Sequence, residues 1–197
     1  MKPALDSVSQ DQLFRQAHTF NKFSDQPVSE QTIRELYELV KWGPTSMNAQ
    51  PGRYVFLKSP AARERLIPAM IAANAEKTRK APLTVIVAMD SQFYDLLPSQ
   101  FKAYDARPIF ADNKPLAEAT AFRNSSLQGA YLMLAARTLG LDCGPMSGFD
   151  PARVDAEFFP DGRWKSNFII NLGYGLESGG YYPRGPRLGF EETAQVL

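Results

Sequence analysis

The feature that most constrains this 197-residue chain is the stretch at residues 118–139, where apolar side chains recur at helical spacing on nearly every face. One stripe is formed by Leu127, Ala130, Tyr131, Leu134, Ala135 and Leu139, and its flanks by Leu132, Met133 and Ala136. A helix that is apolar nearly all round lies in the centre of a protein or in a contact between subunits. Gly140 stands where helices commonly end. We therefore expect the helix at residues 118–139 either to be central and buried or to lie in a subunit interface.

A second unusual stretch, CGPMSGFDP at residues 143–151, comes directly after the helix end. Its two glycines and two prolines are more than a plain turn between helices needs. Glycine lets the backbone approach a group that a side chain would obstruct. Asp150 and Pro151 have the character of a helix N-cap and first position. We therefore expect a loop that lies close to another group and then a new helix.

The other segments alternate helices with a few short strands. We expect helices at residues 9–17, 29–42, 59–70 and 151–159, and strands at residues 53–59, 82–90 and 167–175. Ser9 with Gln12, Ser29 and Ser59 are the expected starts of the first three helices. Residues 91–115 carry aromatics without a period and are interrupted by prolines, which predicts an irregular excursion acting as a lid or packing arm. This pattern predicts one α+β domain of three layers over residues 1–197.

Composition excludes several classes of function. The 22 Lys and Arg residues nearly balance the 21 Asp and Glu residues, so no excess charge favours nucleic acid or an anionic membrane. No run approaches the ~20 apolar residues of a membrane span. The single cysteine, Cys143, rules out an internal disulfide and suits the cytoplasm. One histidine and one cysteine cannot build a dedicated metal site, and no phosphate-loop or serine-hydrolase motif is present.

Small polar residues gather in several loops. The turn GPTSMNAQPG (43–52) offers Thr45, Ser46, Asn48 and Gln50, which either satisfy their own backbone or line a heteroaromatic ligand. Thr19 and Asn21 share one side of an extended stretch, and Asn74 and Lys77 share one helix face. Arg184 and Arg187 are either solvated or able to clamp a phosphate. Taken singly, each group is compatible with an ordinary surface.

Two sequence signatures that follow each other in a fixed order indicate that these loops belong to one site. PTSMNAQP (44–51) is similar to P-[ST]-S-x-N-x-Q-P, and GLDCGPMSGFD (140–150) to G-L-[DG]-x-x-P-[MI]-x-G-F-[DS], about one hundred residues further on. From about residue 10 to residue 197 the chain resembles the FMN-dependent nitroreductase family. The stretches KWGPTSMNAQPGRYVF, EATAFRNSS and KSNFIINLGYG are similar to one branch, the malonic semialdehyde reductases of pyrimidine breakdown. Those enzymes reduce 3-oxopropanoate to 3-hydroxypropanoate.

The resemblance implies a fold, a cofactor and a site. The fold is a three-layer α-β-α arrangement with a central mixed sheet, in an intertwined homodimer that holds tightly bound FMN at its interface. The backbone N–H of Ser147 would donate to flavin N5, and there would be no dedicated catalytic side chain. The other residues that the resemblance places around FMN are His18, Thr19, Asn21, Pro44, Thr45, Ser46, Asn48, Asn74, Lys77, Pro145, Met146, Gly148, Arg184 and Arg187. Of these, Pro44, Thr45, Ser46 and Asn48 would come from the second subunit.

Two positions depart from the family pattern. Ala17 stands where many relatives have an arginine, so one phosphate cation is missing and His18 replaces it only in part. Ser147 stands where several nitroreductases have Glu, which changes the polarity of the pocket. Broad activity on nitroaromatics is therefore not safely inherited.

The expected activity is ping-pong hydride transfer from NADH or NADPH through FMN to a small aldehyde, most simply malonic semialdehyde. Arg123, Arg107 or Lys102 would face the carboxylate of that substrate. Two alternatives stay open: a general nitroaromatic or quinone reductase, and a flavin-binding protein without turnover.

Overall fold

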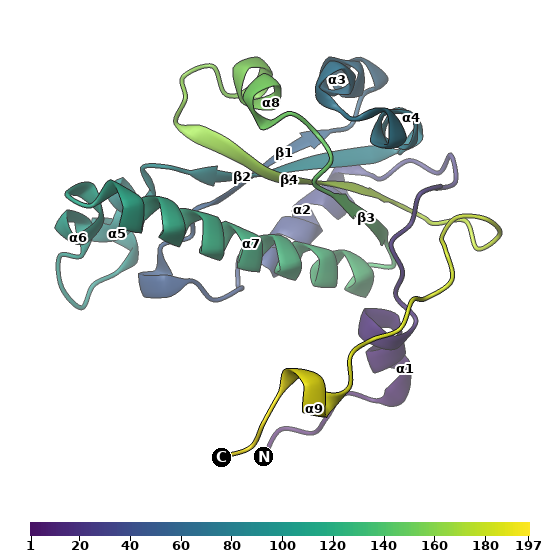
Figure 1. The fold of residues 1–197 in the computed structure, drawn as a ribbon, viewed down its shortest axis with the longest axis horizontal. Coiled ribbons are helices and arrows are strands. Elements are labelled where there is room, and N and C mark those ends of the chain that lie inside the picture. Colours follow the sequence, from purple (N-terminus) through teal and green to yellow (C-terminus); the bar gives the residue numbers. More distant parts are fainter.

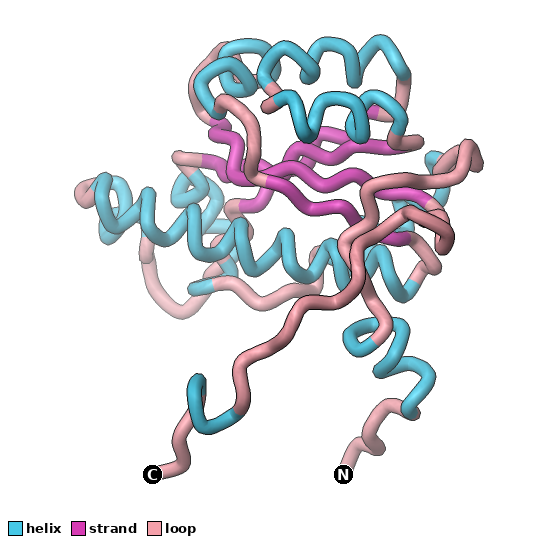
Figure 2. The backbone as a smooth tube through the Cα atoms, turned by 45° about the vertical axis from the view of Figure 1, so that its right-hand side comes forward, coloured by secondary structure: helices cyan, strands magenta, loops and turns pink.

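The computed structural model describes residues 1–197 as three layers. A sheet lies in the middle (Figures 1 and 2). One face is covered by α3 (Pro60–Leu66), α4 (Ala72–Lys80) and α8 (Pro151–Phe158), and the other by α2 (Glu30–Val40) and α7 (Lys114–Thr138). Both termini project beyond the layer of α7, away from the sheet. The expected α-β-α arrangement is therefore confirmed.

The sheet contains the strands β1 (Gly52–Leu57), β2 (Leu83–Asp90), β3 (Asp142–Met146) and β4 (Trp164–Gly173), in the order β1-β2-β4-β3. All neighbouring strands pair antiparallel, so the expectation of a mixed sheet is wrong for these four strands. The reason lies in the order: β2 and β3 run in the same direction, but β4 is inserted between them and is antiparallel to both. Parallel pairing is limited to an isolated bridge between Thr19 and Cys143.

The principal helices are α2 (Glu30–Val40), α3 (Pro60–Leu66), α4 (Ala72–Lys80), α7 (Lys114–Thr138) and α8 (Pro151–Phe158). The short ones are α1 (Ser7–Gln10), α5 (Leu97–Gln100), α6 (Arg107–Ala111), α9 (Phe190–Thr193), the π-turn η1 (Asp11–Arg15) and the 3-10 turns η2 (Ser46–Asn48), η3 (Ile67–Ala69) and η4 (Phe93–Leu96). Ser29, Ser59 and Asp150 cap α2, α3 and α8 as predicted. The first helix starts earlier than expected, because the Asp6 side chain rather than Ser9 accepts the capping hydrogen bond.

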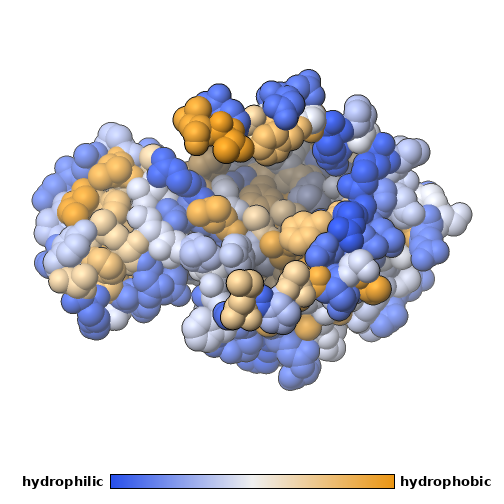
Figure 3. All heavy atoms as spheres, turned by 90° about the horizontal axis from the view of Figure 1, so that it is seen from below, coloured by the Kyte–Doolittle hydropathy of each residue, from blue (hydrophilic) through white to orange (hydrophobic).

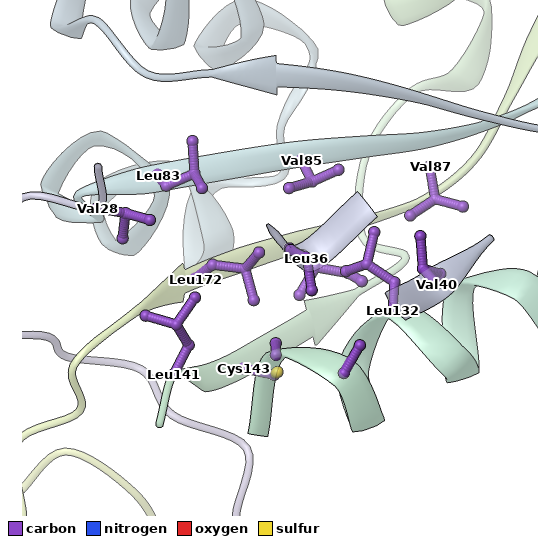
Figure 4. Close-up of a cluster of buried hydrophobic side chains, with 13 residues drawn as sticks. Val28, Leu36, Val40, Leu83, Val85, Val87, Leu132, Leu141, Cys143 and Leu172 are labelled. Atoms are coloured by element: carbon purple, nitrogen blue, oxygen red, sulfur yellow. The ribbon is translucent and has the colours of Figure 1, made fainter. Parts of the chain in front are cut away.

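Alternation along β2 divides the core between the two faces of the sheet. Val85 and Val87 point towards α2 and α7, where they pack with Leu36 and Leu132 (Figure 4). Ile86 and Ala88 point to the opposite face, into a cluster that contains buried residues of α3 and α8. The sheet is thus covered on both faces, which leaves its edges as the places where a site can form.

Helix α7 buries a different face from the one its apolar stripe predicts. The buried side is made of small and polar residues, namely Ala117, Thr120, Ala121, Asn124, Ser125, Gln128 and Gly129, followed by Leu132, Ala135 and Ala136. Gly129 lies so close to β4 that an added Cβ would be 2.3 Å from the Phe168 ring. Leu127 and Tyr131 remain 45% and 39% exposed. On the face seen from below, apolar side chains gather around a hollow (Figure 3).

The stretch at residues 143–151 is only partly a loop. Residues up to Met146 form most of β3, the edge strand, and the loop proper begins at Ser147. Glycine and proline are depleted in strands, which is why the sequence favoured a loop, but Pro145 is tolerated at a sheet edge.

The excursion at residues 91–115 is built from η4, α5 and α6 and ends in the first turn of α7. Its own small core contains Phe93, Leu97 and Phe110, packed against Ala117 and Ala121 of α7. At its base, the buried carboxylate of Asp90 accepts hydrogen bonds from Arg53 and Arg163. The expected irregular segment is therefore a packed arm of short helices.

No helix of the chain is both long and apolar enough to span a bilayer.

Replacing Leu132 tests the packing of α7 on the sheet. Leu132 is fully buried, so Leu132→Ala should lower the free energy of unfolding by about 2–5 kcal/mol through lost burial and a residual cavity. Chemical denaturation monitored by circular dichroism measures it. Glu118→Ala, at an exposed position of the same helix, is the control and should change the value by less than about 0.5 kcal/mol. Equal effects of the two variants would contradict the packing described.

Candidate functional site

Strand β3 and the extended stretch at residues 19–21 lie against each other. The Phe20 N–H donates to the Cys143 carbonyl at 3.0 Å. Gly144 permits this approach, because a Cβ at that position would be 2.4 Å from the Phe20 carbonyl oxygen. Burial raises the pKa of the Cys143 thiol to about 12, so this cysteine is a packing residue and not a nucleophile. The glycine-rich strand thus brings residues 19–21 to the sheet edge.

The turn after β3 is held by α4. The Gly148 carbonyl accepts from the Ile71 N–H at 3.2 Å and from the Asn74 side-chain amide at 3.0 Å. A Cβ on Gly148 would lie 2.5 Å from both side chains, so only glycine fits without a shift. The N–H groups of Ser147 and Gly148 donate to no acceptor in the chain. Two successive backbone donors are therefore free beside an exposed serine.

Lys77 and Asn21 join α4 to the extended stretch. The Lys77 ammonium donates to the Asn21 side-chain oxygen at 3.2 Å, and burial lowers the pKa of this lysine. Beneath them, Asn171 of β4 bonds to Thr84 at 2.8 Å and to Thr78 of α4 at 3.3 Å. This buried polar network fixes α4 on the sheet, and with it the position of the cation.

A cavity of about 440 Å³ opens beside residues 17–21. Of the predicted residues it is lined by His18, Thr19, Asn21, Arg184 and Arg187. The His18 ring stacks on Tyr181 with 4.1 Å between centroids, and the Arg184 guanidinium donates to the Ala17 carbonyl at 2.7 Å. These five predicted residues therefore come together in one positively charged cavity.

Asp142 is the carboxylate near this cavity. Burial raises the pKa of the Asp142 carboxyl, against the hydrogen bond from the Gly175 N–H and the charges of Arg137 and His18, which act to lower it. The Asp142 side chain is thus committed to the turn at Gly175, and the cationic side chains face the cavity.

The predicted residues Pro44, Thr45, Ser46 and Asn48 lie elsewhere. Their turn contains three non-glycine residues with positive φ, Met47, Asn48 and Gln50, a conformation of raised energy that surrounding contacts must hold. The buried amides of α7 supply those contacts: Asn124 accepts from the Ser46 N–H at 2.8 Å and Gln128 from the Gly52 N–H at 2.7 Å. The turn is therefore rigid, with Pro44, Ser46 and Asn48 exposed.

Helix α7 separates the two groups of predicted residues. Asn124 holds the turn at residues 44–48, and Arg137, thirteen positions later, reaches the cavity at residues 17–21. At 1.5 Å per residue these positions are about 20 Å apart along the helix. Within one chain, therefore, the structure assembles two half-sites and does not bring all predicted residues together.

The first half-site has the donors for an anionic, planar ligand. It combines free backbone N–H groups, the half-buried ammonium of Lys77 and an arginine-lined cavity. No group of three or more His, Cys, Asp or Glu side chains is arranged to hold a metal ion. The chemistry available here is binding and electrostatic stabilisation of a ligand.

Comparison with known proteins gives this fold a class. The model of the Nitroreductase family matches residues 14–174. A protein of Ralstonia nicotianae, named as a candidate NADH dehydrogenase/NAD(P)H nitroreductase, is 54% identical over 195 residues, or 99% of this chain and 100% of the relative. A protein of Rhodopseudomonas palustris with the same description is 53% identical over the whole length of both chains.

Solved structures agree on the fold. A candidate nitroreductase of Exiguobacterium sibiricum, solved in complex with FMN, has a TM-score of 0.83 and 18% identity, with 100% of this chain and 99% of that chain covered. A candidate nitroreductase of Bacillus subtilis has a TM-score of 0.83 and 22% identity, with coverage of 98% and 100%. The molecule thus has a nitroreductase-like α+β fold. By the family match and these close relatives, the chain belongs to the nitroreductase family.

Sequence reasoning missed three residues of these half-sites. Arg137 lines the arginine cavity, but in the sequence it is only a basic residue in the last turn of a helix. Asn124 and Gln128 hold the turn at residues 44–52. A signal for the two amides did exist, because a polar side chain inside an apolar helix needs a buried partner.

Gly148→Ala tests the contact between the turn and α4. The added methyl would overlap the Asn74 and Ile71 side chains, so we expect the free energy of unfolding to fall by roughly 1–3 kcal/mol. Gly185→Ala, where a Cβ meets no atom within 4 Å, is the matched control and should be neutral or slightly stabilising. Urea titration compares the two. A Gly148→Ala protein as stable as the control would refute the close approach.

Proposed function

We propose that this protein is an FMN-dependent NAD(P)H oxidoreductase. The observation that carries the proposal is the pair of free N–H groups at Ser147 and Gly148, next to the Asn21–Lys77 pair and the arginine cavity. A flavin ring, a polar ribityl chain and a phosphate require these three kinds of group in this order. The relatives named for NAD(P)H nitroreductases and the FMN complex in a protein of the same fold support the same cofactor.

The residues have distinct roles in this proposal. Bound FMN would supply hydride transfer between NAD(P)H and the second substrate. The Ser147 N–H would donate to N5, with Pro145, Met146 and Gly148 along the same ring edge. Asn74 and Lys77 would face the pyrimidine edge, where a cation stabilises negative charge. Thr19, Asn21 and His18 would contact the ribityl chain, and Arg184 and Arg187 the phosphate.

The second half-site would come from another copy of the chain. The turn with Pro44, Thr45, Ser46 and Asn48 is rigid and exposed, yet about 20 Å along α7 from the first half-site. The apolar stripe with Leu127 and Tyr131 is left exposed beside it. A homodimer that covers this stripe would bring the turn of one chain to the cavity of its partner.

We further propose malonic semialdehyde as the aldehyde substrate. The stretches similar to the malonic semialdehyde reductases include residues 118–126, and these contain Arg123. Of the three candidate cations, Arg107 pairs with Asp95 at 3.3 Å, and Lys102 donates to the Pro98 carbonyl. Arg123 is exposed and lies next to Asn124, the anchor of the turn. Arg123 is thus the best placed to face a substrate carboxylate.

A nitroaromatic or quinone reductase is the second candidate. It is favoured by the relatives that are named for NAD(P)H nitroreductase. Ser147, smaller and neutral where several nitroreductases have Glu, favours the aldehyde instead.

The absorption spectrum tests the oxidoreductase proposal. Purified protein should be yellow with about one FMN per chain, because each chain supplies one complete set of backbone donors and arginines. Anaerobic addition of NADH or NADPH should bleach the flavin bands. Yellow protein that neither nucleotide bleaches would point to a flavin carrier, and colourless protein that does not take up FMN would end the proposal.

The same preparation separates the two substrates. Steady-state rates on 3-oxopropanoate, nitrofurazone and menadione should be highest on the aldehyde. Arg123→Gln should raise KM for 3-oxopropanoate about tenfold or more, and leave KM for menadione, which has no carboxylate, nearly unchanged. Faster turnover of nitrofurazone by the unaltered protein would favour the nitroreductase alternative.

Leu127→Arg tests the homodimer. A charge in the apolar stripe should convert the dimer to a monomer at micromolar concentration, because an unpaired buried charge is strongly unfavourable. Light scattering after size exclusion measures the mass, and flavin content should fall with it. Ala156→Arg, at an exposed position of α8 on the opposite face of the sheet, is the control and should remain dimeric. A flavin-loaded monomer of the unaltered protein would refute the shared site.

A further inference from the structure

The arginines of this chain divide by their partners. Eight of the thirteen form an ion pair with a carboxylate: Arg15, Arg34, Arg53, Arg65, Arg79, Arg107, Arg153 and Arg163. Five do not, and three of those five, Arg137, Arg184 and Arg187, line the same cavity. Arginine guanidinium groups without a carboxylate partner that gather in one cavity mark a place for an anion.

The hydrogen bonds of these three side chains leave donors free. Arg137 donates to the Leu13 carbonyl at 2.7 Å, and Arg184 to the Ala17 carbonyl at 2.7 Å. Arg187 donates to the carbonyls of Gly185 and Pro186 in its own turn. A guanidinium has five N–H donors, so each can hold its backbone partner and still donate to a ligand.

Ala17 leaves the cavity without one cation, and Arg137 supplies a cation in its place. The family resemblance gives position 17 an arginine, and in this chain the Ala17 backbone lines the cavity without contributing a cation. Arg137 enters the same cavity from a different element, the last turn of α7. Its guanidinium also offsets the negative end of the α7 dipole and the nearby Asp142 carboxylate, both of which would repel a phosphate.

From this geometry we propose that Arg137 binds the phosphate of the flavin nucleotide and takes over the role of the arginine missing at position 17. The proposal rests on the proposed FMN-dependent function and adds to it a residue that determines selection of FMN over riboflavin. Arg137 acts in binding and has no part in hydride transfer.

A purely structural role for Arg137 makes a different prediction. Its bond to Leu13 ties α7 to η1, and the Gln12 side chain donates to the Arg137 carbonyl at 2.6 Å. If that were its only role, loss of the guanidinium would change binding of FMN and riboflavin equally, because the phosphate is the difference between these ligands.

The test is a comparison of the two ligands on the full-length apoprotein. Flavin fluorescence titration gives Kd for FMN and for riboflavin, and their ratio measures phosphate recognition. Arg137→Gln should weaken FMN binding about 10- to 100-fold, as expected for a lost hydrogen-bonded charge, and change riboflavin binding less than about twofold. Arg137→Lys should retain part of the FMN preference, because it keeps the charge but not the fork of donors.

Two further variants complete the design. Arg65→Gln removes an arginine that pairs with Glu157 and is absent from the cavity lining, so it should leave both dissociation constants unchanged. Ala17→Arg in the Arg137→Gln background should restore the preference for FMN by returning a cation to the family position.

The possible outcomes are distinct. An unchanged ratio of the two dissociation constants in Arg137→Gln, or a parallel loss for both ligands with intact folding by circular dichroism, would overturn the role of Arg137 and leave the proposed function standing. Unaltered protein that binds neither FMN nor riboflavin would overturn the proposed function itself.

Discussion

The packing of α7 against the sheet is the constraint on which the rest of this structure depends. Small and polar residues form its buried face, and Gly129 lets the helix axis approach the Phe168 ring of β4 closely. The helix is 25 residues long, and its contact with the sheet holds it in place. Positions along the helix therefore have a fixed separation. The middle of the helix holds the turn at residues 44–48 through Asn124, and its C-terminal turn carries Arg137 into the arginine cavity. A rigid spacer cannot bring two half-sites together within one chain, and this is the physical reason for the proposal that the complete site forms between two chains.

The elements of the fold that could be predicted from the sequence are those whose sequence pattern lies in neighbouring residues. Adjacent residues were enough to predict the helix caps at Ser29, Ser59 and Asp150 and the apolar strand β2. The structure confirms these predictions. Strand β3 was missed because Gly144 and Pro145 are unfavourable in strands, and only the neighbouring Phe20 carbonyl explains the glycine. The orientation of α7 was also missed. Its large apolar side chains predicted the buried face, but the close sheet and the strained turn require small residues and amides there.

The candidate site shows the same limit. Motif resemblance named His18, Thr19, Asn21, Arg184 and Arg187, and these line one cavity. It could not name Arg137, since no spacing rule connects the last turn of α7 with residues 17–21. Contacts of this kind depend on tertiary structure, and in this chain they join elements more than one hundred positions apart, as the bond between Arg137 and Leu13 shows.

The net charge of the whole chain does not determine the local charge of the candidate site. The formal net charge is +1, so long-range attraction of an anion is weak. Local selectivity must come instead from which cations lack a carboxylate partner, and most arginines on the surface are paired. The fold keeps Asp142 near Arg137 but binds its carboxylate to the Gly175 N–H, so the carboxylate does not form an ion pair with the arginine. A chain with a net charge near zero can thus favour an anion in one cavity, where a few cations have no carboxylate partner. A count of charges along the sequence does not reveal such a cavity.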